Sequence, residues 1–581
     1  MEKNVLLFIA LSVLILFASQ WLLRPTQPAG VNPPPPSSAP AEQTGPALAQ
    51  PTAQASPPTQ TAQVEAPSQP ESTPLVADAS ERDIVVENAA VRAVFTTRGA
   101  ALKHWILRRY NDPSGRPLDL VSQSVKGATK PFTLMTEDAA TTSTLRNALY
   151  RPSADSLTIG SSPVTLSFDY RDNTGLNVHK EFTFTPDQPY IVSFTARVTR
   201  DESTLDPTIQ WGPALGTGIV ERSGTYNPPP QPIFSKNKSV TRIDAGKIQT
   251  HPVEEGIFEF VGVDDHYFLT AALPGDHPLH VEYQPVSVPI EGSQTSANFV
   301  AWSAKFAAPP TNVRYFAGPK DFDVLEAVNS DLTRAIHFGM FSALVVPLLR
   351  SLKWINGYLG NYGWSIIVLT AIINIVMFPL RHKSVVSMRK MQELQPEVKA
   401  IQDRYAKLKM SDPAKQKMNV ELMNLYRERG VNPASGCVPM LLMMPVLFAF
   451  YSMLSVAIEL RGAPFIGWIR DLSAHDPLYI TPVLMGVTQF IQTKMTPTTG
   501  GDPVQQKMMM FMPLIFTSMF VLAPSGLVLY WTASNLWAIG QQVVTNRLIG
   551  PPAQRVVRPP AERRVKSAGG GRTEQAAKER K

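Results

Sequence analysis

Apolar and polar residues alternate along the first half of the chain, from about residue 83 to 319. In "VTLSFDYRDNTGLNVHKEFTFTPDQPYIVSFTARVT", Val, Phe, Tyr and Thr recur at alternate positions, and Gly, Asn, Asp and Pro interrupt the pattern. Such alternation is typical of antiparallel strands with one buried face. It predicts one large β-sandwich domain over residues 81–330.

Long apolar runs replace this alternation in the second half. They lie at about 360–380, 437–458, 478–492, 508–522 and 526–545, and another covers residues 1–23. Unbroken runs without a central charge favour helical membrane spans over a membrane barrel. A cleaved secretory signal is the alternative for residues 1–23, but no small-x-small cleavage pattern follows them, which favours a retained anchor. The predicted fold class is a polytopic α-helical membrane protein with six transmembrane helices and a large all-β domain.

Two connecting segments have distinct compositions. Residues 24–80 hold 14 of the 53 prolines and have few apolar side chains, which predicts a disordered tether. Residues 331–355 are expected to form an amphipathic helix in the membrane interface, and a soluble core helix is the alternative. The apolar residues that support this helix recur at helical spacing: Leu332, Ile336, Met340, Leu344 and Leu348.

A basic insert, residues 381–432, separates two of the apolar runs. Its apolar positions step by three and four, and Pro396 is placed to kink or start its first helix, which predicts a helical hairpin. A solvated charged face is the alternative to a functional gate or docking platform. The residues chosen as its candidate functional positions are Arg389, Lys390, Leu394, Pro396, Tyr405 and Tyr426.

Charge predicts the orientation in the membrane. Residues 381–430 contain 12 Lys/Arg against 6 Asp/Glu, and residues 546–581 contain 10 against 3. The positive-inside rule places both segments in the cytoplasm. With six spans, both termini are then cytoplasmic and the β domain lies across the membrane, in the periplasm of a double-membrane bacterium. The basic tail, residues 547–581, could bind anionic lipid or ribosomal RNA. The single cysteine, Cys437, excludes an intrachain disulfide.

Polar residues inside the apolar runs are the candidate functional site. Unpaired polar groups are costly in hydrocarbon, so these side chains must face one another or water. Hydrogen bonds that tie helices together are the simpler explanation for each residue alone. As a set, they predict a hydrophilic groove for substrate, and several short runs predict a locally thinned bilayer. The candidate groove residues are Thr370, Asn374, Gln489, Tyr530, Trp531, Ser534 and Asn535.

The chain resembles the YidC branch of the YidC/Oxa/Alb family of membrane-protein insertases. The resemblance covers nearly the whole chain and is most specific in "GNYGWSIIVLT", "VNPASGCVPMLLMMPVLFAFY", "ELRGAPFIGWIRDLSAHDP", "MTPTTGGDPVQQKMMMFMPLIF" and "PSGLVLYWTASNLW". It implies a five-helix insertase core with a hydrophilic groove, a cytoplasmic hairpin and a periplasmic β super-sandwich. It also implies a chaperone role in folding and assembly of inner-membrane proteins. The implied partners are nascent membrane proteins, the Sec translocon, the ribosome and membrane lipids.

Two residues depart from the family pattern. Met443 stands where many relatives have a glutamine. Members usually have an arginine where this chain has Asn374. An amide keeps the hydrogen-bonding capacity but loses the positive charge. We therefore expect hydration and bilayer thinning, rather than attraction of acidic segments, to support insertion here.

Three other functions compete with insertion. A secondary transporter would need intramembrane carboxylates or histidines, which the span centres lack. An enzyme in the β domain could use Asp264, Asp265 and His266, but a turn before a buried strand explains them more simply. A chaperone or assembly scaffold overlaps with insertion. No phosphate-binding loop is present, so ATP is not the expected energy source. Burial of the client helix in lipid would supply the energy, and we expect no cofactor or metal.

Overall fold

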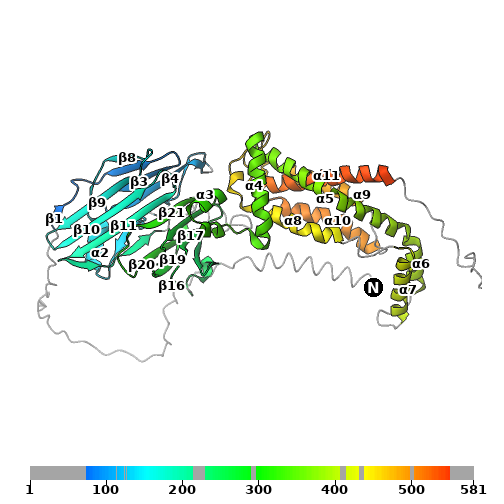
Figure 1. The fold of residues 1–581 in the computed structure, drawn as a ribbon, viewed down its shortest axis with the longest axis horizontal. Helices are drawn as coiled ribbons and strands as arrows, with labels where there is room; N and C mark the ends of the chain where they lie inside the picture. The colour runs from blue at the N-terminus through cyan, green and yellow to red at the C-terminus, as the bar shows by residue number, and fades with distance from the viewer. Residues whose placement is uncertain are drawn as a thin grey trace, which may run out of the picture. The chain divides into compact units, whose positions relative to one another are not determined.

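The computed structural model describes residues 73–549 except 113, 124, 126, 213–228, 251, 290–295, 406–413, 431–437 and 497–502. The predicted anchor 1–23, most of the tether 24–80 and nearly all of the basic tail 547–581 lie outside the described residues. The rest forms a β domain followed by a set of helices (Figure 1).

Three sheets build the β domain, which is the mostly β-sheet domain that the alternating pattern predicted. The strand orders are β1-β9-β10-β11-β21-β18-β17-β14-β15, β16-β19-β20-β13-β6 and β5-β4-β3-β2-β8, with β12 and β7 added to the first sheet. The bounds are β1 Pro74–Val76, β2 Asp83–Glu87, β3 Val91–Thr96, β4 Ala101–Asn111, β5 Pro117–Asp119, β6 Thr133–Met135, β7 Arg151–Pro152, β8 Ser156–Thr158, β9 Val164–Asp172, β10 Leu176–Phe184, β11 Ile191–Arg200, β12 Ser203–Leu205, β13 Thr208–Trp211, β14 Gln231–Lys236, β15 Ser239–Arg242, β16 Val253–Gly256, β17 Phe260–Asp264, β18 Phe268–Leu273, β19 Leu279–Pro289, β20 Ser296–Phe306 and β21 Val313–Pro319.

An aromatic layer joins the small sheets to the large one. The Phe182 ring of β10 lies 4.6 Å from the Phe95 ring of β3 and 5.2 Å from the ring of Phe132, which precedes β6. The Trp105 indole of β4 donates a 2.8 Å hydrogen bond to the Ala317 carbonyl of β21. Every second residue of β10 is buried, as expected for a strand with one core face. Both small sheets therefore cover the same face of the large sheet, which makes a sandwich.

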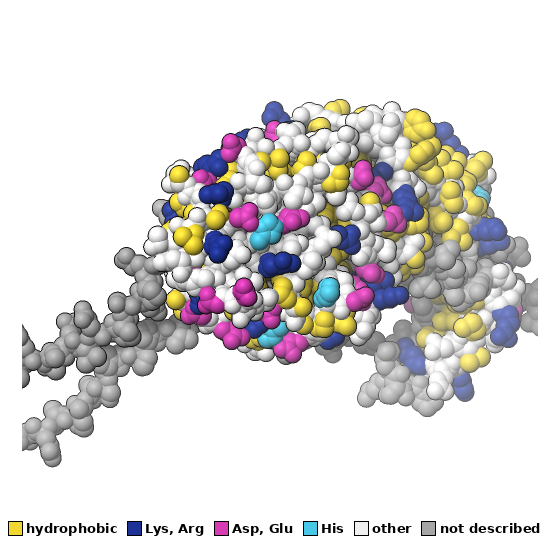
Figure 2. Space-filling model, turned by 60° about the vertical axis from the view of Figure 1, so that its left-hand side comes forward, with side chains coloured by type: hydrophobic (Ala, Val, Ile, Leu, Met, Phe, Trp, Pro, Cys, Tyr) yellow, Lys and Arg dark blue, Asp and Glu magenta, His cyan; other side chains and the backbone are white. Residues whose placement is uncertain are grey.

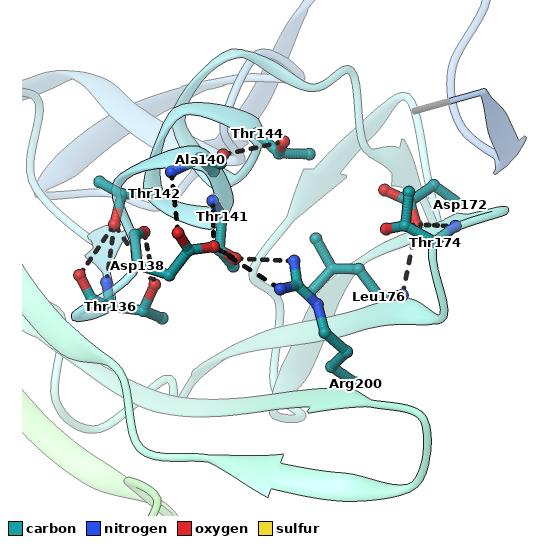
Figure 3. A network of polar contacts seen from close by, with 10 residues as sticks. All are labelled: Thr136, Asp138, Ala140, Thr141, Thr142, Thr144, Asp172, Thr174, Leu176 and Arg200. Carbon is teal, nitrogen blue, oxygen red and sulfur yellow. Dashed lines mark hydrogen bonds and ion pairs between the residues drawn. The ribbon is translucent and has the colours of Figure 1, made fainter. Parts of the chain in front are cut away.

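Two short helices accompany the strands: α2 Ala139–Asn147 lies between β6 and β7, and α3 Phe322–Val328 follows β21. Asp138 caps α2 by accepting hydrogen bonds from the Ala140 and Thr141 amides at 3.3 and 2.9 Å (Figure 3). Arg200 of β11 lies 3.6 Å from the Asp138 carboxylate and donates to the Thr141 hydroxyl at 2.7 Å. The capping residue Asp138 therefore also attaches α2 to the large sheet. The alternation of apolar and polar residues along the chain could not predict this tertiary contact.

The exposed face of the β domain is polar and mixed in charge. Lys and Arg side chains lie interspersed with Asp and Glu in Figure 2. Ion pairs on this domain include Lys305–Glu137 at 2.9 Å and His280–Glu255 at 2.6 Å. Such a surface is typical of a domain in water.

The Asp264–His266 segment forms the turn between β17 and β18. Asp265 accepts hydrogen bonds from the backbone amides of Tyr267 and Phe268 at 2.8 and 2.6 Å. The Asp264 carboxylate lies 3.2 Å from both Arg242 and Lys320. The geometry is that of the turn that the sequence favoured over an acid–base site.

Two predicted boundaries are wrong. The β domain begins inside the predicted tether, because Pro74–Val76 forms β1 and pairs with the end of β9. Residues 331–355 are not one helix: 3₁₀ turns cover Ser330–Ala335 and Gly339–Phe341, and the α-helix α4 is Ser342–Leu359. Leu332 and Ile336 belong to the buried core, whereas Met340 is 88% exposed, so these residues do not share one helical face.

The five apolar runs after the β domain are helical, as predicted. They correspond to α5 Tyr362–Glu393, α8 Val438–Val456, α9 Ile480–Met495, α10 Pro503–Phe520 and α11 Ser525–Ile549. Within the described part of the chain, α5 alone combines the length and apolar composition needed to cross a membrane. Shorter apolar helices cover Met444–Val456 and Met510–Phe520.

The basic insert contains the predicted hairpin, with a different start. α5 continues without a break through Arg381 to Glu393, and the hairpin helices are α6 Gln395–Arg404 and α7 Ala414–Glu428. Pro396 lies in the first turn of α6, a position where proline is tolerated because its missing N–H has no helical partner. Arg429 and Glu397 connect the two ends of the hairpin at 2.8 Å.

Candidate functional site

Helices α5 and α11 run parallel, side by side. Near their starts, a Cβ atom added at Gly526 of α11 would lie 3.5 Å from Ile366 Cδ1 of α5. Near their ends, Arg389 of α5 donates a 2.6 Å hydrogen bond to the Asn546 side chain of α11. Residues at equal distances along the two helices therefore lie at the same level.

A cavity of about 490 Å³ lies between α5, α8, α9 and α11. All seven candidate groove residues chosen from the sequence line it. It also has apolar lining from α8, including Met444, Leu447 and Phe450. Its polar and charged lining residues are Thr370, Asn374, Arg381, Ser384, Gln489, Gln492, Thr496, Tyr530, Trp531, Ser534, Asn535, Gln541 and Gln542.

On the α5 wall, Thr370 and Asn374 occupy one face of the helix, one turn apart. The Thr370 hydroxyl donates to the Ile366 carbonyl at 2.6 Å, and the Asn374 amide donates to the Thr370 carbonyl at 2.7 Å. Asn374 is only 5% exposed. Bonds back to the preceding turn satisfy donors without a partner helix, so neither residue needs another helix to bond its donor.

On the α11 wall, two polar side chains bond across to α9. The Asn535 amide donates to the Thr488 hydroxyl at 3.2 Å, and the Trp531 indole donates to the Gln489 side-chain oxygen at 3.0 Å. These bonds tie two helices together, which is the simpler role weighed for single polar residues. Asn535, Trp531 and Gln489 thus bond between helices and line the cavity as well.

Aromatic contacts fix the middle of α11. The Tyr530 ring stacks on Phe450 of α8 with centroids 4.5 Å apart. The Trp531 ring lies 5.2 Å from Phe520 of α10. The two neighbouring aromatic residues therefore join α11 to α8 and to α10.

Sequence reasoning missed several cavity residues at the end toward the hairpin. Arg381 was counted as the start of the basic insert, but it lies on the cavity face of α5, two turns after Asn374. Ser384, Gln541 and Gln542 were missed because they lie at or beyond the ends of the apolar runs. The helical spacing of Ser534, Ala538 and Gln541 along α11 was the signal that could have found Gln541.

The hairpin candidates lie at different places. Leu394 is buried with Met391, and Tyr426 packs against both. The Tyr405 hydroxyl donates to Glu421 at 3.4 Å across the hairpin. Pro396 and Lys390 are exposed, and Arg389 bonds to α11 as described above. The six residues therefore do not form one cluster.

Among the described residues, no group of three or more His, Cys, Asp or Glu side chains is arranged to hold a metal ion.

Comparison with known proteins identifies the family. A family model described as "60Kd inner membrane protein" matches residues 354–551, and one described as "YidC periplasmic domain" matches residues 83–351. A protein of Geotalea uraniireducens named "Membrane protein insertase YidC" is 36% identical over 564 residues, covering 94% of this chain and 99% of that protein. The chain belongs to the YidC family.

Other relatives with the same name agree. One from Geobacter sulfurreducens is 37% identical, and the match covers 80% of this chain and 86% of that protein. One from Ralstonia nicotianae is 36% identical, and the match covers 81% of this chain and 84% of that protein. A solved structure entitled "Active YidC insertase crystal structure with the first transmembrane domain resolved" covers 82% of this chain and 95% of that one at 18% identity, with a TM-score of 0.33. The assignment to the YidC family therefore comes from the sequences. The two family models meet between residues 351 and 354, inside α4, which separates the β domain from the cavity helices.

Proposed function

We propose that this YidC-family chain is a membrane protein insertase and chaperone. It inserts, folds and assembles inner-membrane proteins, alone or with the Sec translocon. The observation that carries the proposal is the cavity lined by hydroxyl, amide and guanidinium groups between otherwise apolar helices. Relatives that share a third or more of their residues with it over most of its length are named as insertases.

The cavity would act by keeping water inside the apolar layer. The main barrier to insertion is the polar flank of a client helix, because its backbone and side-chain groups lose their water in hydrocarbon. Hydroxyl and amide groups whose donors already bond to their own helix, as in Thr370 and Asn374, still have oxygen lone pairs that can accept hydrogen bonds from water or from a client segment. Burial of the client's apolar helix in lipid then supplies the driving force, without a cofactor.

Short helices support the second part of the mechanism, local thinning of the bilayer. α9 has 16 residues and α10 has 18. At 1.5 Å per residue they extend about 24 and 27 Å, less than the roughly 30 Å of hydrocarbon in a typical bilayer. A thinner layer shortens the path of a polar segment.

The orientation belongs to the same proposal. The apolar runs supply six spans, and the distribution of Lys and Arg then favours a cytoplasmic hairpin, cytoplasmic termini and a periplasmic β domain. The hairpin and the basic tail would then meet the ribosome and anionic lipid, and the cavity would receive clients from the cytoplasmic side.

Photocrosslinking tests the proposal. A photoreactive amino acid is placed at Thr370, Asn374 or Tyr530, and ribosome-bound nascent chains of a membrane protein are added. We expect crosslinks from all three positions to the client, and none from the lipid-facing control Val376, which is 63% exposed, before the client's helix reaches lipid. Crosslinks from positions in the β domain alone would contradict the proposal.

A further inference from the structure

One loop, residues 461–479, contacts three of the cavity helices and is continuous with the fourth. It leads from the 3₁₀ turn after α8 to the start of α9, at the end of the helices opposite the hairpin. Its own backbone hydrogen bonds hold its shape, with the Phe465 amide donating to the Ile469 carbonyl and the Leu472 amide to the Ala463 carbonyl, both at 3.0 Å. The loop therefore has a defined fold that can position the helices.

The loop supplies the hydrogen-bond acceptors for the start of α11. The first amides of a helix have no partner within the helix. In α11 these amides belong to Ser525 and Gly526, which donate to the Ala474 and Leu472 carbonyls at 2.7 and 2.8 Å. A Cβ atom added at Gly526 would lie only 3.2 Å from the Leu472 carbonyl oxygen. The two backbones are thus in close contact as well as hydrogen-bonded.

Asp476 joins the loop to α9. Its carboxylate is buried, since the residue is 1% exposed. One oxygen accepts the amide and the hydroxyl of Thr481, in the first turn of α9, at 2.8 and 2.9 Å. The other accepts the Trp468 indole and the Leu478 amide, both at 2.9 Å. Four donors on one buried carboxylate form a charge-assisted network that fixes the loop to the helix.

Asn361 and Gly363 join the loop to the start of α5. The Asn361 side-chain oxygen accepts the Trp364 amide at 3.2 Å, and its nitrogen donates to the Phe465 carbonyl at 3.0 Å. The Phe465 side chain lies directly on Gly363, where an added Cβ would be 2.5 Å from Phe465 Cγ and 2.9 Å from Phe465 Cβ. Only glycine leaves room for this contact.

Apolar side chains fill the space between this loop and the cavity. On the loop side, the cavity lining ends at Thr370 of α5, Phe450 of α8, Gln489 of α9 and Tyr530 of α11. Beyond these levels, each of the four helices has apolar side chains that are at most 4% exposed and do not line the cavity: Ile366, Leu369, Met453, Leu454, Met485, Leu527 and Val528. The four helices are therefore packed together at the loop end and separated by the cavity nearer the hairpin.

We propose that loop 461–479 holds one end of all four cavity helices at a fixed spacing, so that a client widens the cavity only at the hairpin end. Asp476 and Gly363 are the positioning residues. Neither lines the cavity, so both act through the loop. The inference rests on the proposed insertase function and adds to it the place where the cavity opens for a client.

Thiol labelling without any client tests the attachment. Leu369→Cys is introduced into the full chain with Cys437 replaced by Ser, and an impermeant maleimide is added to membranes from either side. A cysteine reacts as its thiolate, which needs contact with water, so this packed position should react slowly from both sides. Asp476→Asn should speed labelling from the side of the loop by about tenfold, because an amide cannot accept all four hydrogen bonds. Gly363→Ala should act in the same direction by displacing Phe465.

Each variant has a matched control. Asp471→Asn changes a carboxylate whose hydrogen bonds to the amide and hydroxyl of Ser473, at 2.8 and 2.7 Å, stay within the loop. Gly357→Ala adds a Cβ that would meet no atom within 4 Å. Both should leave the labelling rate unchanged. Trp468→Phe removes one of the four donors and should give an increase of about threefold, which keeps the test usable if Asp476→Asn lowers the amount of folded protein.

A second cysteine distinguishes positioning from general loosening of the helices. Asn374→Cys lies within the cavity, and Asp476→Asn should leave its labelling from the hairpin side unchanged. An equal increase at Asn374→Cys and Leu369→Cys would overturn the proposal. So would unchanged labelling of Leu369→Cys in both Asp476→Asn and Gly363→Ala.

Spin labels test where the cavity widens. One pair, Val368 and Val483, lies near the loop, and the other, Lys383 and Ile491, lies nearer the hairpin. Each pair joins α5 and α9 through exposed side chains that do not line the cavity. When ribosome-bound nascent membrane protein is added, the second distance should lengthen and the first should not, whereas both should lengthen in Asp476→Asn.

Lengthening of both distances in the unmodified loop would overturn the proposal, as would no change in either distance while the client is inserted. If the unmodified chain inserts no client faster than protein-free vesicles, the proposed function itself is wrong. That failure is distinguishable, because the labelling of Leu369→Cys needs no client and tests the loop separately.

Discussion

A single amide at the centre of an apolar helix, Asn374, is the residue that first indicated a cavity. Its amide bonds within α5, so its presence is not explained by a bond to another helix. Such a residue makes the cavity wall polar without needing a hydrogen bond to another helix. The sequence identified it because Asn374 is the one polar residue in the apolar stretch of residues 371–380.

Asn374→Leu should slow insertion of a client with an uncharged polar tail by about tenfold, which corresponds to roughly 1.4 kcal/mol of barrier, because the cavity wall becomes apolar. Asn374→Arg should preserve that rate and increase the rate for an acidic tail. Ile375→Leu, at a lipid-facing neighbour that is 56% exposed, is the control. Unchanged insertion by Asn374→Leu in the proteoliposome assay would contradict the role assigned to the amide.

A second residue, Lys180, shows how the β domain tolerates a fully buried charge. Its ammonium donates to the carbonyls of Gly99, Phe132 and Ala100 at 2.7, 2.8 and 3.3 Å. All three acceptors have positive φ, at 68°, 66° and 44°. The lysine therefore joins two strained loops to β10. Burial lowers the pKa of Lys180 to about 7, while the three carbonyls stabilise the charged form.

The pKa of Lys180 predicts how stability changes with pH. Because the folded chain binds this proton less tightly than the unfolded chain, the unfolded chain carries more protons between pH 7 and 10, and stability rises with pH. The expected slope is about 1.4 kcal/mol per pH unit in this window. Pulse proteolysis of the full chain in urea, at pH 7 and pH 9, measures it for the β domain.

Lys180→Met should lose this slope, because the variant has no group there to titrate. Lys236→Met is the control: Lys236 also donates to a backbone carbonyl, that of Glu255 at 2.9 Å, but it is exposed. An identical pH slope in Lys180→Met and the unmodified chain would show that Lys180 does not control it.

At the scale of elements, one ion cluster connects α3, α4 and the loop between α8 and α9. Lys353 of α4 lies 2.5 Å from Asp323, 3.2 Å from Asp321 and 3.2 Å from Glu459. The Glu459 side chain is 6% exposed. Burial raises the pKa of Glu459, and the Asp321 charge adds to that effect, while Lys353 opposes it. The lysine thus joins two acidic groups at the start of α3 to one in the segment between α8 and α9.

Removal of Lys353 should therefore destabilise the junction. Lys353→Met leaves the Glu459 carboxylate buried without its cation, which costs about 3 kcal/mol. A carboxyl with a raised pKa favours the folded state as pH falls, so the loss should shrink at pH 5 relative to pH 8. Thermal unfolding of the purified chain in detergent at both pH values measures the difference.

Arg350→Met provides the comparison, since Arg350 is on the same helix and pairs with Glu326 at 3.0 Å through side chains that are 58% and 48% exposed. Its effect should be below about 1 kcal/mol and independent of pH in this range. A Lys353→Met loss that is equally small, or equal at both pH values, would contradict the importance of the cluster.

The elements also show what could be predicted from sequence and what could not. Apolar runs located five of the helices after the β domain, α5, α8, α9, α10 and α11, because a continuous apolar run marks the part of a helix that would lie in a membrane layer. The apolar run ends before Arg381, but α5 continues to Glu393. A helix can continue into polar sequence, because its backbone hydrogen bonds do not depend on apolar side chains. The 331–355 helix was overextended because Leu332 and Ile336 recur at helical spacing but pack separately in the β-domain core.

For the whole molecule, the family and the division into a β domain and a helical part were predictable, and the arrangement of the cavity was not. Gln541 and Arg381 are 160 residues apart in the chain. Their proximity depends on the parallel alignment of α5 and α11, which no local pattern encodes. The candidate residues found from sequence were those inside apolar runs, where a polar group is conspicuous. Those missed lie at the ends of the runs, where polar residues are ordinary.

Insertion through the cavity requires water inside it while the surrounding helices face lipid. Thiol labelling measures this directly, because a cysteine reacts as its thiolate, which needs contact with water. The single native cysteine, Cys437, is replaced by Ser, and cysteine is then introduced at Asn374, Ser534 or the lipid-facing position Val376 in the full chain in membranes. A small, membrane-impermeant maleimide is added from the cytoplasmic side. The account predicts that Asn374→Cys and Ser534→Cys react at least about tenfold faster than Val376→Cys. Equal, slow labelling at all three positions would show a dry, closely packed interior and would contradict it.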